Sequence, residues 1–243
     1  MGPGDSISSL CYDEIRMKLA IIVPVFNEAL TIKEMVQCLR AVQIDKEIIV
    51  VDDASTDGTT DALKAVEGPD LLVLRHETNM GKGAAIRTAL ARVTAEAVVI
   101  QDADLEYDPE QLPELLKPIA GGQADAVYGS RFLGSIEGMR LANYLANKIL
   151  SWTATFLYGQ LITDEATCYK MFRTDLIRSM PLECKRFEFC PEVTARTLLK
   201  KVQILELPIN YRGRTTLEGK KINLMDAFSA FATLLKYRFR KTG

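Results

Sequence analysis

Residues 97–106 read Ala-Val-Val-Ile-Gln-Asp-Ala-Asp-Leu-Glu, so an apolar, largely β-branched run is followed at once by three acidic residues. A short apolar run bounded by polar residues is typical of a strand buried on both faces. If the acidic segment continues as extended chain, Asp102, Asp104 and Glu106 point to the same side. An Asp-x-Asp pattern alone carries little weight, but its place directly after a strand favours a Mg²⁺ site completed by substrate phosphates.

The alternation of apolar runs and amphipathic segments continues on both sides of this stretch. Strands are predicted over residues 19–25, 47–51, 71–74, 97–100 and 124–128. Helices are predicted over residues 31–42, 59–66 and 81–94, and from Pro109 to about Gly121. Continuous Val and Ile runs flanked by helices predict an α/β fold, with a mostly parallel, Rossmann-like sheet and helices on both faces.

Polar residues follow three of the predicted strands: Asn27, Glu28, Asp52, Asp53, Asp102 and Asp104. In a parallel sheet the carboxyl ends of the strands form the edge where ligands bind. Each residue taken alone could equally cap a helix or form a turn. Their meeting at one edge favours a divalent cation with oxygen ligands, because clustered carboxylates otherwise repel one another.

Composition excludes several other classes of protein. The 243 residues are 48% hydrophobic and 26% charged, which is ordinary for a globular chain. A net charge of −2 gives no basic field for nucleic acid, so we expect no nucleic-acid partner. Five cysteines without a Cys-x-x-Cys pair argue against a zinc site and a disulfide framework. The single histidine, His76, excludes chemistry that needs two, and we expect it to form local hydrogen bonds.

The segment Asn79-Met80-Gly81-Lys82-Gly83 precedes a predicted helix, where backbone amides can hold an anion. It is not a dinucleotide fingerprint, because Ile86 stands where a third glycine or alanine belongs. The first sixteen residues are polar and lack an apolar segment, so we interpret them as a loose arm or tag and expect the fold to begin at Met17.

Four motifs, in order and spacing, resemble glycosyltransferase family two: Pro24-Val-Phe-Asn-Glu28, Val51-Asp-Asp-Ala-Ser-Thr-Asp-Gly-Thr59, Asp102-Ala-Asp104 and Gly129-Ser-Arg-Phe132. The resemblance covers nearly the whole chain from Met17. It is closest to the dolichyl-phosphate mannosyltransferase-like branch, which uses polyprenyl-phosphate acceptors. Residues 163–173 and 213–222 look like the bacterial members of that branch. Ala54 in place of glycine and Phe26 in place of tyrosine are small departures.

This resemblance implies a GT-A fold in one domain over residues 17–243, with a C-terminal amphipathic helix. Residues 17–131 would form the nucleotide-sugar half, and residues 132–243 the acceptor half. The implied reaction is an inverting transfer of a hexose from GDP-mannose or UDP-glucose to dolichyl or undecaprenyl phosphate, with Mg²⁺ or Mn²⁺ as the cofactor.

The resemblance also implies roles for individual residues. The nucleotide-sugar pocket would contain Pro24, Asn27, Glu28, Asp53, Lys82, Asp102 and Ala103. The metal would be held by Asp104 and Glu106, and the catalytic set would be Asp104, Arg131 and Asp164. The acceptor phosphate would meet Arg131, Arg212, Arg214, Lys220 and Lys221. Because that acceptor is already an anion, Asp164 would orient groups rather than remove a proton.

Other functions remain open from the sequence. The main alternative is a family-two transferase that acts on a saccharide or other hydroxyl acceptor, with Asp164 as base. A phospho-receiver domain also places paired acids after a strand, but it is half this length and its acids follow the first strand. A sugar-phosphate nucleotidyltransferase should have a glycine-rich loop after the first strand, and residues 23–28 contain no glycine.

Two segments suggest contact with a membrane. Residues 141–162 carry one charged residue, Lys148, but scattered polar residues favour a buried helix or one on the bilayer surface over a membrane span. Trp152 within it would be a membrane anchor or part of the core. Residues 224–241 combine spaced Leu and Phe residues with a basic end, which suits an anionic surface as well as core packing. We expect a cytoplasmic protein that lies peripherally on the inner face of the membrane.

Overall fold

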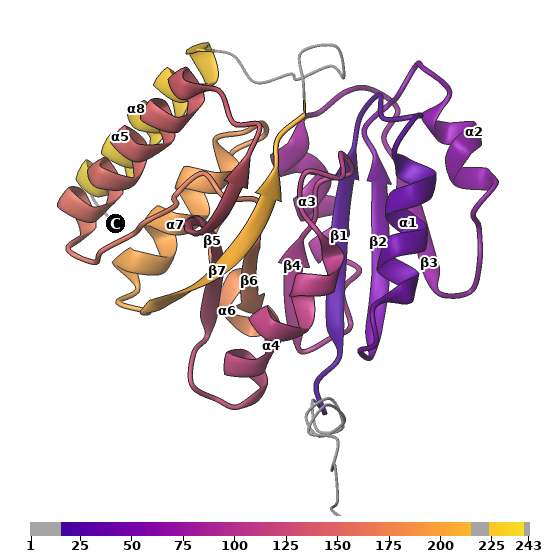
Figure 1. The fold of residues 1–243 in the computed structure, drawn as a ribbon, viewed down its shortest axis with the longest axis horizontal. Coiled ribbons are helices and arrows are strands. Elements are labelled where there is room, and N and C mark those ends of the chain that lie inside the picture. Colours follow the sequence, from indigo (N-terminus) through magenta and orange to yellow (C-terminus); the bar gives the residue numbers. More distant parts are fainter. Residues whose placement is uncertain (1–15, 215–223, 241–243) are drawn as a thin grey trace, which may run out of the picture.

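The computed structural model describes residues 16–214 and 224–240. A sheet of seven strands forms the centre of the fold (Figure 1). The strands are β1 (Leu19–Val25), β2 (Lys46–Asp52), β3 (Leu71–Arg75), β4 (Ala97–Ile100), β5 (Ala126–Glu137), β6 (Lys170–Arg173) and β7 (Ile204–Arg212). Their order across the sheet is β3-β2-β1-β4-β6-β5-β7. Neighbouring strands are parallel, except that β6 runs antiparallel to both β4 and β5.

Helices pack around this sheet (Figure 1). They are α1 (Ile32–Ala41), α2 (Thr59–Lys64), α3 (Lys82–Leu90), the 3-10 turn η1 (Pro109–Gln111), α4 (Leu112–Ala120), α5 (Leu141–Tyr158), α6 (Thr174–Arg178), α7 (Phe189–Leu199) and α8 (Leu224–Phe239). Helices α5, α7 and α8 contact one another at the end of the molecule beyond β5 and β7 (Figure 1).

The central strands explain why the sheet is mostly parallel. All four residues of β4 and six of the seven residues of β1 are buried. Strands that are apolar on both faces need cover on both sides, which helical crossovers between parallel strands provide. Each fully buried Val, Leu or Ile contributes roughly 1.5–3 kcal/mol, so these strands hold the loops at their carboxyl ends in fixed positions.

The second half of the chain departs from the predicted pattern. The fifth strand runs to Glu137, well beyond the predicted end at Tyr128. Its far part pairs with β7 alone, after a register shift between Ser130 and Ser135, and is largely exposed. The prediction did not include β6 or β7. For β6 the reason is that it has only four residues and begins and ends with a basic one.

A second, smaller core joins α5, α7 and α8. It consists of Leu150, Ala154, Ala195, Ala230, Leu234 and Tyr237. The apolar residues of α8 therefore divide between the core and the surface: Leu234 is fully buried, while Phe228 and Phe239 are exposed to solvent. Lys220 and Lys221, two of the predicted acceptor-phosphate residues, lie outside the described residues.

Candidate active site

A cavity of about 820 Å³ lies at the carboxyl edge of the strands, where the sequence predicted a site. One side is formed by the loops after β1, β2 and β4 and by the start of α3, and it includes Pro24, Glu28, Asp53, Lys82, Asp102, Ala103, Asp104 and Glu106. The other side is formed by α5, α7 and α8, and it includes Ala142, Ala146, Leu150, Cys190, Pro191 and Ala230. The charged side thus shares one cavity with a mostly apolar side, to which α5 also contributes the polar residues Asn143 and Asn147.

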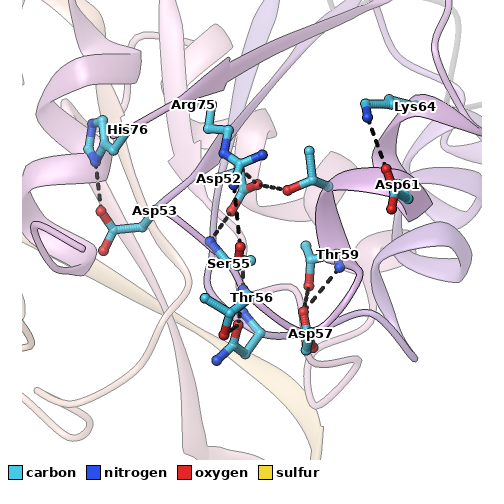
Figure 2. A network of polar contacts seen from close by, with 12 residues as sticks. Asp52, Asp53, Ser55, Thr56, Asp57, Thr59, Asp61, Lys64, Arg75 and His76 are labelled. Atoms are coloured by element: carbon cyan, nitrogen blue, oxygen red, sulfur yellow. Dashed lines mark hydrogen bonds and ion pairs between the residues drawn. The ribbon is translucent and has the colours of Figure 1, made fainter. Parts of the chain in front are cut away.

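Asp53 fixes the turn before α3. Its carboxylate accepts hydrogen bonds from the backbone amides of Met80 (2.8 Å) and Gly81 (2.7 Å) and pairs with His76 Nδ1 at 2.6 Å. The other ring nitrogen of His76 lies 2.9 Å from Thr88 Oγ1. Figure 2 shows the His76–Asp53 pair beside the cluster of Asp52 and Ser55. As predicted, His76 makes local hydrogen bonds, and Asp53 reaches the cavity wall already engaged with protein groups.

Asp52 and Asn27 shape loops instead of lining the cavity. Asp52 accepts a hydrogen bond from the amide of Ser55 at 2.9 Å (Figure 2). It accepts another from Thr60 Oγ1 at 2.6 Å. Asn27 Oδ1 accepts the amide of Thr56 at 2.8 Å, which ties the loop after β1 to the loop after β2. For Asp52 the turn-forming interpretation is therefore the correct one.

The acidic segment after β4 is folded, and the expectation of an extended chain is wrong. The strand ends at Ile100, and Leu105 adopts a left-handed backbone conformation with φ of 60°. Gln101 Nε2 donates to the carbonyl of Asp102 (3.0 Å), inside the same turn. Asp102, Asp104 and Glu106 nevertheless all line the cavity, because the turn, instead of strand alternation, directs them there.

Basic side chains already form ion pairs with acidic residues of this cavity. Lys82 Nζ lies 2.5 Å from Asp102 Oδ1. Arg214 pairs with Glu28 through Nη1 (2.9 Å) and with Asp104 through Nη2 (3.0 Å). Burial, followed by the negative charges of Asp102 and Glu106, raises the pKa of Asp104 to about 7, against the lowering effect of Arg214. The site therefore gathers more negative charge than its own cations fully neutralise.

Glu106 is held by the end of β7 and by the residues that follow it. Its Oε2 accepts the hydroxyl of Tyr211 at 2.6 Å, and its Oε1 accepts the amide of Arg214 at 2.8 Å. No group of three His, Cys, Asp or Glu residues is arranged to hold a metal within the described ranges.

Arg131 and Asp164 form a buried bidentate ion pair. Arg131 Nε and Nη2 each lie 2.7 Å from an oxygen of Asp164, and the Arg131 amide donates to the same carboxylate at 2.9 Å. Burial alone would lower the pKa of Arg131, but the Asp164 charge keeps that pKa well above its ordinary value. Arg131 lines the cavity, whereas Asp164 is fully buried and does not. Asp164 thus holds Arg131 in place, and its carboxylate does not face the ligand space.

Arg212 and Arg214, which were predicted together, point to different places. Arg214 lines the main cavity, as described above. Arg212 is exposed at the end of β7 and lines a smaller hollow with Glu137 and Asp108.

The glycines at the start of α3 serve a close backbone contact. A Cβ atom on Gly81 would lie 2.5 Å from the carbonyl oxygen of Lys185, and one on Gly83 would lie 2.5 Å from that of Cys184. The Gly81 amide donates to Asp53, and the Ala84 amide donates to Lys185 (3.0 Å). The backbone amides that were expected to bind an anion therefore donate largely to protein acceptors. The loop of residues 183–187 packs where that anion would have been.

Sequence reasoning missed several residues that line the cavity: Tyr107, Glu165, Arg186, Phe187 and Tyr211. Arg186 and Phe187 belong to the loop of residues 183–187, where neither strand nor helix periodicity gives a signal. Glu165 is fully buried beside Asp164, and neither carboxylate oxygen has a hydrogen-bond partner. The nearest cation is Lys170 Nζ at 3.8 Å, and burial raises the pKa of Glu165 to about 7.

The outer side of α5 is apolar and open to solvent. Its exposed residues are Leu141, Leu145, Ile149, Trp152 and Phe156, the last of them 89% exposed. Phe228, Phe231 and Phe239 of α8 are exposed as well. Within residues 16–214 and 224–240, no helix combines the length and apolar character needed to cross a bilayer. Helix α5 thus contributes alanine, asparagine and Leu150 side chains to the cavity and large apolar side chains to the surface.

Comparisons with known proteins agree with these features. The profile of the family Glycosyl transferase family 2 matches residues 20–180. The undecaprenyl-phosphate mannosyltransferase of Micrococcus luteus is 33% identical over 218 residues, covering 84% of this chain and 87% of its own. The UDP-N-acetylglucosamine–dolichyl-phosphate N-acetylglucosaminyltransferase of Methanococcus voltae is 28% identical and covers 91% of this chain and 96% of its own.

A solved structure supports the fold. Glucosyl-3-phosphoglycerate synthase from Mycobacterium tuberculosis, in complex with Mn²⁺, UDP and phosphoglyceric acid, superposes with a TM-score of 0.71 at 21% identity. The match covers 93% of this chain and 80% of that chain. At this identity the similarity bears on architecture alone, and it confirms the predicted GT-A type of α/β fold.

Proposed function

Because the chain belongs to glycosyltransferase family 2, we propose that it transfers a hexose from a nucleotide sugar to the phosphate of a polyprenyl phosphate. The observation that carries this proposal is the single cavity in which charged residues face the apolar side of α5, α7 and α8. A nucleotide sugar suits the charged side, and the first isoprene units of a lipid acceptor suit the apolar side. The named activities of the relatives from Micrococcus luteus and Methanococcus voltae support a polyprenyl-phosphate acceptor.

The donor would lie along the loops after β1, β2 and β4. Pro24, Asp53, Asp102 and Ala103 line this wall, and Lys82 supplies a cation beside Asp102. Asn27 would contribute indirectly, because its hydrogen bond to the Thr56 amide fixes the loop that carries Glu28. The named relatives use different sugars, so GDP-mannose and UDP-glucose both remain donors to test.

A divalent ion, Mg²⁺ or Mn²⁺, fits the acids after β4. Burial, together with the negative charges of Asp102 and Glu106, raises the pKa of Asp104 to about 7. A bound cation would favour the ionised carboxylate against both effects. Asp104 and Glu106 would hold the ion together with diphosphate oxygens, in keeping with the preference of Mg²⁺ for few carboxylates and substrate phosphates. When bound, such an ion stabilises the charge that grows on the leaving diphosphate.

The acceptor phosphate needs cations and no general base, because it is already ionised at neutral pH. Arg131 is suited to this task, since Asp164 holds its guanidinium rigidly at the cavity wall. Arg214, which lines the same cavity, would add positive charge. Lys220 and Lys221, which lie outside the described residues, remain proposed acceptor-phosphate residues on the resemblance alone. For Arg212 a role at the acceptor phosphate requires movement, because it lines a different hollow.

We also propose that the exposed faces of α5 and α8 rest on a membrane surface, where the lipid acceptor is found. Leu145, Ile149, Trp152 and Phe156 follow one side of α5 at helical spacing, and Phe228 and Phe239 extend this surface on α8. The basic residues Lys236 and Arg238 in the last turn of α8 would favour anionic lipid. This arrangement would place the apolar side of the cavity next to the bilayer.

The test is a transfer assay with matched acceptors. Purified protein is incubated with GDP-mannose or UDP-glucose and Mg²⁺ or Mn²⁺, in the presence of undecaprenyl phosphate or of undecaprenol, which lacks the phosphate. We expect release of nucleoside diphosphate and formation of a glycosylated lipid with the phosphate alone. Equal transfer to undecaprenol, or to a saccharide, would instead support the hydroxyl-acceptor alternative.

A further inference from the structure

The cations that line the cavity differ in whether protein carboxylates already neutralise them. Lys82 is paired with Asp102 at 2.5 Å. Arg131 is paired with Asp164 at 2.7 Å. Arg214 is paired with Glu28 and with Asp104. A substrate phosphate that approaches any of these three meets a cation whose charge a protein carboxylate already offsets.

Arg186 is different, although it lines the same cavity. In the part of the chain that the structure describes, its guanidinium makes no hydrogen bond and no ion pair with any side chain or carbonyl. Its aliphatic stem lies against the backbone of Gly81, since a Cβ atom on that glycine would come within 2.9 Å of Arg186 Cγ. The exposed Arg186 side chain thus presents at the cavity a guanidinium that no described protein group binds.

The loop that carries Arg186 is firmly anchored. The Glu192 carboxylate accepts the amides of Glu183 and Cys184, each at 2.8 Å. Arg87 donates to the carbonyl of Cys184, and the Ala84 amide donates to the carbonyl of Lys185. The guanidinium of Arg186 is therefore presented from a fixed backbone, which lowers the entropy cost of binding a ligand.

We propose that Arg186 binds a phosphate group of a substrate. The proposal rests on the proposed function and adds to it a phosphate-binding residue outside the recognised motifs. Arginine suits this task because its planar fork donates two parallel hydrogen bonds to phosphate oxygens. The acids on the charged wall would repel an incoming phosphate, so a cation without a protein partner is the group best able to receive one.

The position of Arg186 allows two sources for that phosphate. On one side it adjoins Gly81 and Lys82, which belong to the donor wall. Arg186 also lies just before α7, whose residues Cys190 and Pro191 line the same cavity on the mostly apolar side, where the lipid would lie. The group bound is therefore either the diphosphate of the donor or the monophosphate of the acceptor, and an experiment with separate arms distinguishes them.

The experiment compares Arg186→Ala and Arg186→Lys with Lys185→Ala. Lys185 is the neighbouring residue, is also exposed and loses the same charge, but it does not line the cavity. One arm measures the Kd for GDP and UDP by calorimetry at two salt concentrations. The second arm measures KM and kcat for undecaprenyl phosphate at saturating donor. Thermal unfolding checks that all variants are folded.

We expect Arg186→Ala to weaken one of the two phosphate-dependent constants by about 10- to 100-fold, as for loss of a charge-assisted hydrogen bond. Arg186→Lys should recover part of that loss, and Lys185→Ala should stay within about twofold of wild type. The affected arm identifies the phosphate. The proposal is overturned if Arg186→Ala changes neither constant by more than twofold, or if Lys185→Ala has the same effect. Wild-type protein that binds nucleotide but transfers nothing to undecaprenyl phosphate would refute the acceptor assignment, while the nucleotide arm still tests Arg186.

Discussion

Replacing Asp164 by asparagine should destabilise the protein more than it alters the chemistry. Asp164 is fully buried and accepts three hydrogen bonds from Arg131, at 2.7, 2.7 and 2.9 Å. Asparagine keeps one acceptor oxygen but turns an amide NH₂ group toward an N–H donor, and the Arg131 charge loses its counterion. Removing one partner of a buried ion pair costs about 3–5 kcal/mol. With a urea m-value of about 2–3 kcal/mol/M, the unfolding midpoint should fall by about 1–2.5 M.

The matched control for this variant is the double substitution Arg131→Met with Asp164→Leu. Replacing both partners by apolar groups of similar size is often neutral for stability, so the double variant should regain most of the lost midpoint. Unlike Asp164→Asn, the double variant should be inactive, because it lacks the Arg131 guanidinium that lines the cavity. Urea unfolding and steady-state kinetics together decide the matter. If Asp164→Asn unfolds like wild type while kcat falls by about 100- to 10,000-fold, Asp164 is a general base and the orienting role is refuted.

Three further perturbations test other parts of the site. Asp104→Asn should lower kcat at least about 100-fold without unfolding the protein, and wild-type turnover at limiting Mg²⁺ would contradict the metal assignment. Glu165 has its pKa raised to about 7 by burial, so the native state keeps a proton that the unfolded state loses near pH 4.5. The free energy of unfolding should therefore fall as the pH rises from about 4.5 to 7 and level off above. Glu165→Gln should flatten that profile in urea titrations, and an unchanged slope would refute the assignment. Trp152→Ser should reduce cosedimentation with anionic vesicles at low salt, whereas Leu72→Ser, an exposed apolar change on β3, should not; equal binding by both variants would remove the membrane role of α5.

The parts of the fold that the sequence predicts are those in which local pattern and burial agree. β1 and β4 are apolar on both faces, so their residues alone identify strands, and the rule for parallel sheets then places Asp53, Asp102 and Asp104 at one edge. β6 could not be found in this way, because a four-residue strand that contains the buried Lys170 has no apolar run. Its place depends on β4 and β5, which pair with it from both sides.

The pairing of charges within the site was beyond the reach of motif reasoning. The motifs identified Arg131 and Arg214 as cations for a phosphate, but their present partners come from distant segments, as Glu28 does for Arg214. Such pairs depend on which loops meet across the cavity and leave no periodic signal. The same reason explains why Arg186 was missed, since two glycines of α3 and the buried Glu192 determine its place.

The position of β6 has a consequence for how the chain folds as it is synthesised. β1 to β4 are complete once Ile100 has left the ribosome, and β3, β2, β1 and β4 can pair in that order. The second edge of β4 is covered only by β6, which emerges after β5 and α5 have been made. For that interval the nascent chain carries an apolar strand with an open edge, a form prone to aggregate with other chains. We expect refolding at high protein concentration to lose yield at this stage, and fragments that end before Lys170 to precipitate or to require a chaperone.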